Sequence, residues 1–470
     1  MRKLLYLSII LAMLFLAVPL VQAQAPAKYE TQVNVTNVAD VNGAITLRFF
    51  KRDGTELKPI TRPIEAYETI YFTSFQDISN FDGSMVIESD VPLASMGMLI
   101  SKNSAGNATG YAGYIGVPGG SDTVYLPLLM NSNYGYSTFF YIQNTTDTPI
   151  SATVTYSNGK VTQIPNIEPS ASHKIDNRGE AGLPKHFSAV VTASGAVAVA
   201  VVEYNDGTGN QLYSYNGFES GDTLPIFPMI NENNYGYWTS ANIQNTGTKS
   251  TTITMTYTPT EAGSSCTETI TIPAGEKRDF GTYAFAFPLD WAPYTVASTC
   301  KNGERFIGSG TVTANSANQP LVGIVNQINE TNDPNKGAAL MSQSAALASD
   351  TIVFPFVQQW VGPWSWWTSM TVINVSGSTI AKNDIVCSVK CTASGGSPVD
   401  ITMKNPEALA NNAGWLHQFY WDRAPIPEGF LGGAICKSTS GQSIVGTLNI
   451  LAHNAGIQVD SLAVYEGISQ

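Results

Sequence analysis

The residues able to do chemistry are few in this sequence, and their spacing fits no common catalytic pattern. The four histidines are His173, His186, His417 and His453, and no two of them stand at metal-ligand spacing. The sequence contains no H-E-x-x-H motif, G-x-S-x-G elbow, P-loop or G-x-G-x-x-G fingerprint. Carboxylates occur singly in loops, so no pair can be assigned as general acid and base. We therefore expect a protein that is not an enzyme and uses no cofactor or metal, with a secreted hydrolase as a lower-ranked alternative.

Two acidic turns, Tyr204–Gly207 and Asn329–Asp333, offer oxygen ligands that could bind calcium between domains. Neither has the spaced ligands of a known calcium loop. Asn, Asp and Gly also form ordinary tight turns, which is the simpler interpretation.

Tryptophan is distributed unevenly along the chain. Trp rings suit the apolar faces of sugars and also serve as buried anchors for protein partners. The segment 358–364 widens a loop that carries two of them, so Trp360, Trp364 and Trp366 are the candidate ligand-binding residues. The alternative is that these rings cover a terminal domain or pack against its neighbour. Six of the eight tryptophans lie after residue 350: Trp360, Trp364, Trp366, Trp367, Trp415 and Trp421.

The cysteines suggest disulfides in an exported chain, since all five lie in its second half. Cys266 and Cys300 each flank an insertion that a disulfide could staple. Cys387 and Cys391 stand four residues apart on one strand, roughly 13 Å, too far to pair with each other. One of them should therefore meet Cys436, and Cys391 is favoured because both lie near strand ends.

An internal repeat explains how the chain is built. Residues 127–145, PLLMNSNYGYSTFFYIQNT, return as residues 228–246, PMINENNYGYWTSANIQNT, with ten of nineteen positions identical at a shift of 101. Weaker copies lie near residues 355–374 and 31–37. A long fixed period indicates tandem domains. In the N-Y-G-Y core, Gly135 permits a positive-φ bend, and the tyrosines are expected to cover the end of the domain. The alternative is a repeated aromatic platform.

The repeats read as antiparallel β-structure. Short alternating segments such as Ala152–Tyr156 and Ile253–Tyr257 are typical of half-buried strands, and turns recur every 8–12 residues. We expect an all-β fold of four tandem antiparallel β-sandwich domains, at 24–120 (repeat 1), 121–221 (repeat 2), 222–349 (repeat 3) and 350–470 (repeat 4). Short junctions favour a semi-rigid, elongated rod. Repeat 1 lacks the opening strand of the others, so an unpaired sheet edge there could support self-assembly.

The motif T-x-x-x-[I/V]-x-N, the x-T-x-T-Y strand and the segment Ile272–Glu276 together resemble tandem immunoglobulin-like modules of secreted bacterial cell-surface proteins. The resemblance extends over the whole mature chain, and its motifs are generic. It implies stalks, adhesins, surface-layer parts or carbohydrate-binding modules, and it assigns no functional residue.

The ends and the charge indicate an exported protein. Arg2 and Lys3 precede an apolar run, and Val21-Gln22-Ala23 fits a cleavage site, so residues 1–23 are expected to be a signal peptide. The remaining chain has no run long enough for a membrane helix. A net charge of −12 disfavours nucleic acid as a partner. We expect a secreted or cell-surface structural or adhesive protein that binds surface or matrix components, with a carbohydrate-binding protein using repeat 4 as the alternative.

Overall fold

The computed structural model describes residues 28–73, 75, 78, 80–205, 211–329, 336–362, 364–393, 398–420, 429–453 and 462–470. The expected signal peptide, Trp421 and the central residues of both acidic turns lie outside them. The described chain is almost entirely antiparallel β-structure. The prediction of an all-β fold of tandem antiparallel sandwiches is confirmed.

Repeats 1, 3 and 4 each contribute two sheets, and in repeat 2 the long strand β13 joins the two equivalent halves into one seven-stranded sheet. We call the sheet that contains the last long strand of a repeat its closing sheet. The other is the opening sheet, and in repeats 2 to 4 it contains the strand that opens the repeat (β8, β15 or β24), which repeat 1 lacks. In repeat 1 the closing sheet has the order β4-β1-β6-β7 and the opening sheet the order β3-β2-β5. Their bounds are β1 Lys28–Asn37, β2 Gly43–Lys51, β3 Ile60–Ile64, β4 Thr69–Phe72, β5 Gly83–Ser89, β6 Leu93–Lys102 and β7 Ala108–Ile115.

Repeat 2 has the same plan with the opening strand added. The long strand β13 bends after its first half, so that its first half pairs with β8 and β10 and its second half with β9 and β14. Its elements are β8 Ser121–Met130, β9 Tyr136–Asn144, β10 Ile150–Tyr156, β11 Val161–Ile167, β12 Ser172–Asp176, β13 His186–Asn205 and β14 Leu212–Asn216.

Repeat 3 pairs β15-β21-β17-β18-β20 in its opening sheet and β19-β16-β22-β23 in its closing sheet. An insertion between β19 and β21 adds a π-helical turn, η1 Thr282–Ala286, and a short 3-10 turn, η2 Leu289–Trp291. The strands are β15 Ile226–Glu232, β16 Tyr237–Asn245, β17 Thr251–Ala262, β18 Cys266–Ile272, β19 Lys277–Phe280, β20 Val296–Ser298, β21 Phe306–Asn315, β22 Leu321–Asn329 and β23 Lys336–Met341.

Repeat 4 pairs β27-β26-β29-β24-β32 in its opening sheet and β28-β25-β30-β31 in its closing sheet. The strands are β24 Thr351–Gln359, β25 Trp366–Asn374, β26 Ile385–Ala393, β27 Pro398–Lys404, β28 Gly414–Gln418, β29 Phe430–Ser438, β30 Ile444–Ala452, β31 Leu462–Glu466 and β32 Ile468–Ser469.

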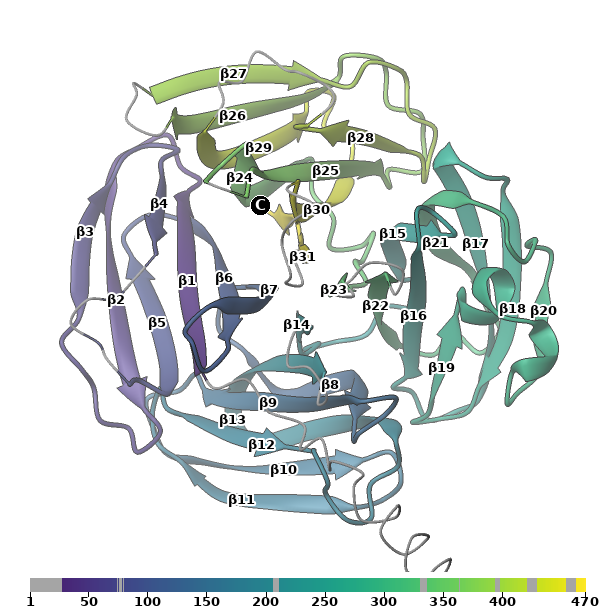
Figure 1. The fold of residues 1–470 in the computed structure, drawn as a ribbon, viewed down its shortest axis with the longest axis horizontal. Coiled ribbons are helices and arrows are strands. Elements are labelled where there is room, and N and C mark those ends of the chain that lie inside the picture. The colour runs from purple at the N-terminus through teal and green to yellow at the C-terminus, as the bar shows by residue number, and fades with distance from the viewer. Residues whose placement is uncertain are drawn as a thin grey trace, which may run out of the picture.

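The four repeats form a closed ring (Figure 1). The opening sheet of each repeat packs against the closing sheet of the next: β8 contacts β16 and β22, β15 contacts β25 and β30, and β24 contacts β1 and β6. The last strands β7, β14, β23 and β31 meet one another around the centre. There Gly337 lies against Tyr213, and a Cβ at this glycine would stand 2.2 Å from the tyrosine ring. The expected elongated rod is therefore wrong.

The ring closes because the outward faces of the sheets are apolar as well as the inward ones. Met96, Met98 and Ile100 of β6 in repeat 1 belong to the same hydrophobic cluster as the core of repeat 4. Tyr111 contacts Trp366 across this junction with ring centroids 4.8 Å apart. The short junctions turn the chain into a ring, and the repeats do not extend into a line.

Repeat 1 has no opening strand among its described residues, and repeat 2 covers the space that such a strand would occupy. Tyr29 of β1 packs edge-on against Phe139 of β9, with centroids 5.5 Å apart. Ser84 of the edge strand β5 donates to the carbonyl of Ser170 in repeat 2. The edge that the sequence suggested for self-assembly thus lies against the neighbouring repeat.

Equivalent turns follow the opening strands of repeats 2 to 4. They are Asn133–Tyr136, Asn234–Tyr237 and Val361–Trp366. Because every repeat points its last strand to the centre and packs against the next repeat in the same direction, these turns occupy equivalent places around the ring.

Candidate ligand-binding cleft

A cavity of about 100 Å³ lies between repeats 3 and 4. By a comparable measure one water needs about 10–15 Å³, so the space admits a group of several heavy atoms. None of its lining residues carries a charge. Repeat 3 contributes Pro228, Met229, Asn231, Asn234, Thr260, Ile307 and Gly308. Repeat 4 contributes Ser369, Thr371, Leu416, Gln418 and Asn449.

The repeat 4 wall is a polar row across three strands. Ser369 of β25 is directly opposite Gln418 of β28 and Asn449 of β30. Because side chains alternate along a strand, these three point outward to repeat 3, whereas Thr368 and Met370 point into the core. Asn449 also reaches across to repeat 3, with its Nδ2 3.2 Å from the sulfur of Met229.

The same row is filled at the junction of repeats 1 and 2. The residue that follows the repeated Thr is Ser369 in repeat 4 and Phe139 in repeat 2. Phe139 is paired with Val202, and both belong to a hydrophobic cluster with Ala112 and Tyr29 of repeat 1. A small hydroxyl residue in place of a large ring therefore keeps the cleft between repeats 3 and 4 open.

Two amide oxygens in the cleft are left without a partner. The Oδ1 atoms of Asn231 and Asn449 are buried and accept no hydrogen bond within the described part of the chain. Asn231 as a whole is only 8% exposed. Buried polar atoms are nearly always satisfied, so these two acceptors mark an imperfectly paired polar contact between the two repeats.

An aromatic cluster stands beside the polar row, toward the start of β25. It consists of Trp360, Trp367, Tyr420 and His453. Trp367 precedes Ser369 by two residues, and Tyr420 follows Gln418 by two. Because β25 and β28 are antiparallel, both rings lie on the same side of the polar row, with their centroids 5.3 Å apart. The ring centroid of Trp360 lies 4.9 Å from that of Tyr420 and 5.1 Å from that of His453, which it meets edge-on. The hydroxyl of Tyr420 and Nε2 of His453 are 3.2 Å apart.

The opposite rim of the cleft is the turn of repeat 3. Asn234, which lines the cavity, accepts a 2.9 Å hydrogen bond from Nε of Arg305. The Arg305 guanidinium also lies over the ring of Tyr235, 5.5 Å from its centroid. Tyr235 is 85% exposed. The cleft is therefore flanked by aromatic rings from both repeats.

The N-Y-G-Y core is a two-residue hairpin turn with positive φ at both central residues. The φ angles are 50° at Tyr134 and 85° at Gly135, and the same at Tyr235 and Gly236. The prediction of a positive-φ bend at this glycine is confirmed. The expectation that both tyrosines cover the domain is wrong for the first of them, because Tyr134 is 95% exposed. The second, Tyr136, bonds through its hydroxyl to Gln211.

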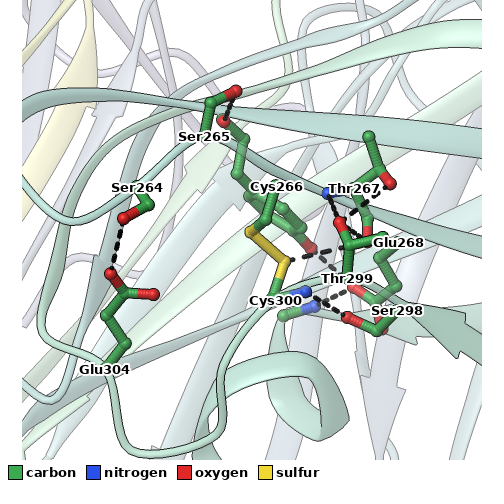
Figure 2. The surroundings of a disulfide bond; sticks show 11 residues. Ser264, Ser265, Cys266, Thr267, Glu268, Ser298, Thr299, Cys300 and Glu304 are labelled. Atoms are coloured by element: carbon green, nitrogen blue, oxygen red, sulfur yellow. Dashed lines mark hydrogen bonds between the residues drawn. A yellow bond between two sulfur atoms is a disulfide. The ribbon is translucent and has the colours of Figure 1, made fainter.

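A disulfide secures the insertion of repeat 3 that supports the turn Asn234–Tyr237 at the rim of the cleft. Cys266 at the start of β18 is bonded to Cys300 after β20 (Figure 2). Beside it, Thr267 and Thr299 exchange two hydrogen bonds, from Thr267 N to Thr299 Oγ1 and from Thr299 N to Thr267 O. The end of the insertion then holds the turn, because Asn233 Nδ2 donates to the carbonyl of Glu304 at 2.9 Å.

The second disulfide corrects the favoured pairing of Cys391. Cys436 of β29 is bonded to Cys387 of β26. The two are direct register partners, whereas Cys391 stands opposite Gly432. Register between β26 and β29 selects the pair, and the sequence does not reveal that register.

The predicted tryptophans lie in different surroundings. Trp360 belongs to the aromatic cluster. Trp366 instead contacts Tyr111 of repeat 1, and the ring centroid of Trp364 lies 6.1 Å from that of Trp366. Trp415 is buried in the core of repeat 4. Adjacent Trp366 and Trp367 occupy opposite faces of β25, as a strand requires.

The sequence reasoning missed the polar residues of the cleft, which are Asn231, Ser369, Gln418 and Asn449. The only available signal was their place at outward positions of strands, where polar residues are normal. Nothing in the sequence shows which outward face meets another repeat.

Buried carboxyls lie behind the repeat 3 wall. Glu232, next to Asn231, accepts hydrogen bonds from the backbone N–H and hydroxyl of Thr239. Glu268 accepts from the hydroxyl of Tyr257 at 2.6 Å and from Gly281 N–H at 2.7 Å. Burial raises the pKa of Glu268 to about 7 and raises the pKa of Glu232 well above its ordinary range. Both are therefore held mostly protonated below neutral pH, which keeps unpaired charge away from the cleft wall.

The histidines are dispersed. Burial lowers the pKa of His173, and the Lys277 charge together with burial lowers the pKa of His186. Within the described ranges, no three His, Cys, Asp or Glu residues gather as a metal site would require. The helical segments in the same ranges are too short or too polar to cross a bilayer.

Comparison with known proteins gives no assignment. No protein-family model matches the chain, and no curated protein matches it. One similar solved structure is described as a crystal structure of the tetra-tandem repeat in the extending region of a large adhesion protein. It is 13% identical, and the match covers 96% of this chain and 97% of that one, with a TM-score of 0.11. A likeness at this TM-score supports no conclusion about function.

Proposed function

We propose that this is a secreted or cell-surface binding protein that attaches to a neutral carbohydrate through the cleft between repeats 3 and 4. Its role is adhesive or structural and involves no catalysis. The observation that carries the proposal is an uncharged cavity lined by amide and hydroxyl side chains, including Asn234, Ser369 and Gln418, beside an aromatic cluster. Sugar hydroxyls both donate and accept, so they can pair with such side chains.

The chemistry of the lining supports a neutral sugar. Amide and hydroxyl side chains offer both donors and acceptors, which suits hydroxyl groups, and the absence of charge from the lining disfavours uronic or sialic acids. The adjacent rings of Trp367 and Tyr420 provide the apolar surface on which the C–H face of a sugar packs. Two disulfides suit a protein that works outside the cell.

The test is retention of the mature protein on insoluble cellulose, mannan, xylan and chitin. Ser369→Phe is the decisive variant, because Phe139 already occupies the equivalent place in repeat 2 and the fold accommodates it there. We expect Ser369→Phe to fill the cleft and abolish retention. Trp360→Ala with Trp367→Ala should weaken it. Wild-type retention on none of these polymers, or full retention of Ser369→Phe with an unchanged melting temperature, would refute the proposal.

A further inference from the structure

Two equivalent turns each carry an exposed tyrosine in an unfavourable backbone conformation. Tyr134 and Tyr235 are 95% and 85% exposed and have φ of 50°. A bulky side chain at positive φ is strained, and the first central position of such a turn is normally Asn, Asp or Gly. Exposure of the ring adds no burial energy in return. A residue that helps neither the turn nor the core points to a contact outside the chain.

Tyr235 stands at the mouth of the cleft. Its neighbour Asn234 lines the cavity, and Arg305 ties the two together by bonding Asn234 and stacking over the Tyr235 ring. On the repeat 4 wall, the aromatic cluster of Trp360, Trp367, Tyr420 and His453 adjoins Ser369 and Gln418 of the cavity lining. Aromatic surfaces on both sides of a cavity that admits only a few heavy atoms form a series of contacts longer than one sugar.

We propose that the ligand is an extended neutral polysaccharide that lies across the mouth of the cleft, from Tyr235 on repeat 3 to the aromatic cluster on repeat 4. One sugar residue directs hydroxyls into the cavity toward its amide and hydroxyl side chains, and its neighbours stack on the flanking rings. Internal residues of a chain are bound in this arrangement, and a chain end is not required. This rests on the proposed function.

The experiment measures affinity against chain length by calorimetry with cello-, manno-, xylo- and chito-oligosaccharides of one to six residues. For the series that binds, affinity should rise steadily with length. Tyr235→Asn places the favoured residue in the turn, so its melting temperature should be equal to or higher than that of the wild type. Its affinity for the longest oligosaccharide should fall by about 2- to 12-fold, the range for one aromatic contact, with little change for the single sugar.

Tyr134→Asn is the matched control, because it makes the same change in the same kind of turn but Tyr134 does not line the cleft. It should keep full affinity at every length. An equal loss in both variants, or no loss in Tyr235→Asn, would overturn the proposal. A single sugar that binds as tightly as the hexamer would overturn it while the proposed function stands. No binding of any series by the wild type would instead refute the function itself.

Discussion

Glu203 gives the most direct test of how the ring depends on pH. This residue of β13 in repeat 2 is fully buried, and its Oε2 accepts a 2.7 Å hydrogen bond from Nδ2 of Asn326 in repeat 3. Its other oxygen and Oδ1 of Asn326 have no partner within the described residues. Burial raises the pKa of Glu203 to about 8, against smaller lowering effects of the Asn326 bond and the Lys277 charge.

The sign follows from the folded-state pKa, which lies above the ordinary value of 4.5. Below pH 4.5 the carboxyl is protonated in both states, and the contribution to stability is complete. As the pH rises from 4.5 toward 8, the carboxyl ionises in the unfolded chain and lowers its free energy. The folded chain keeps the carboxyl protonated, so the free energy of unfolding falls. At 1.36 kcal/mol per pKa unit, the loss from this one group reaches about 3 kcal/mol at pH 7.

Glu203→Gln should remove this loss. Its amide can accept from Asn326 Nδ2 and donate to Asn326 Oδ1, so the interface between repeats 2 and 3 stays bonded. We expect the variant to be more stable than the wild type by only about 1 kcal/mol at pH 5, and by about 3–4 kcal/mol at pH 7 to 8. The assay is the denaturation midpoint at pH 5, 6, 7 and 8. Glu261→Gln, at an exposed position, is the control. Parallel curves for Glu203→Gln and the wild type would refute the reasoning.

Three further outcomes are expected. Small-angle scattering should give a radius of gyration of about 23 Å, as for a compact chain of this length. A value about twice as large would instead support an elongated rod. A non-reducing peptide map should join Cys266 to Cys300 and Cys387 to Cys436, and Cys387→Ala should cost about 2–4 kcal/mol of stability. In the same map, Cys391→Ala should leave both bridges in place, and a new Cys391–Cys436 peptide in the wild type would contradict the register. Trp366→Ala removes the contact with Tyr111 at the closure of the ring and should cost about 1–3 kcal/mol, which thermal unfolding would reveal; no change would mean that the contact contributes nothing to closure.

The sequence by itself determined the strands, the turns and the repetition, because these depend on local patterns. Alternation along segments such as Ile253–Tyr257 reports which side chains face a core, and Gly135 reports a bend with positive φ. These signals act over a few residues, so they survive in a single chain without any knowledge of its partners.

Only the tertiary structure decided how the repeats meet. Whether the outward face of β6 or β25 contacts solvent or another repeat depends on residues more than a hundred positions away. That Met96 and Phe356 belong to one hydrophobic cluster cannot be read from either segment alone. Register shows the same limit, since Cys387 and Cys391 share a strand face and only the alignment of β26 with β29 selects one of them. The candidate cleft belongs to this second class. Ser369 and Asn231 are ordinary polar strand residues until the ring brings their two repeats together.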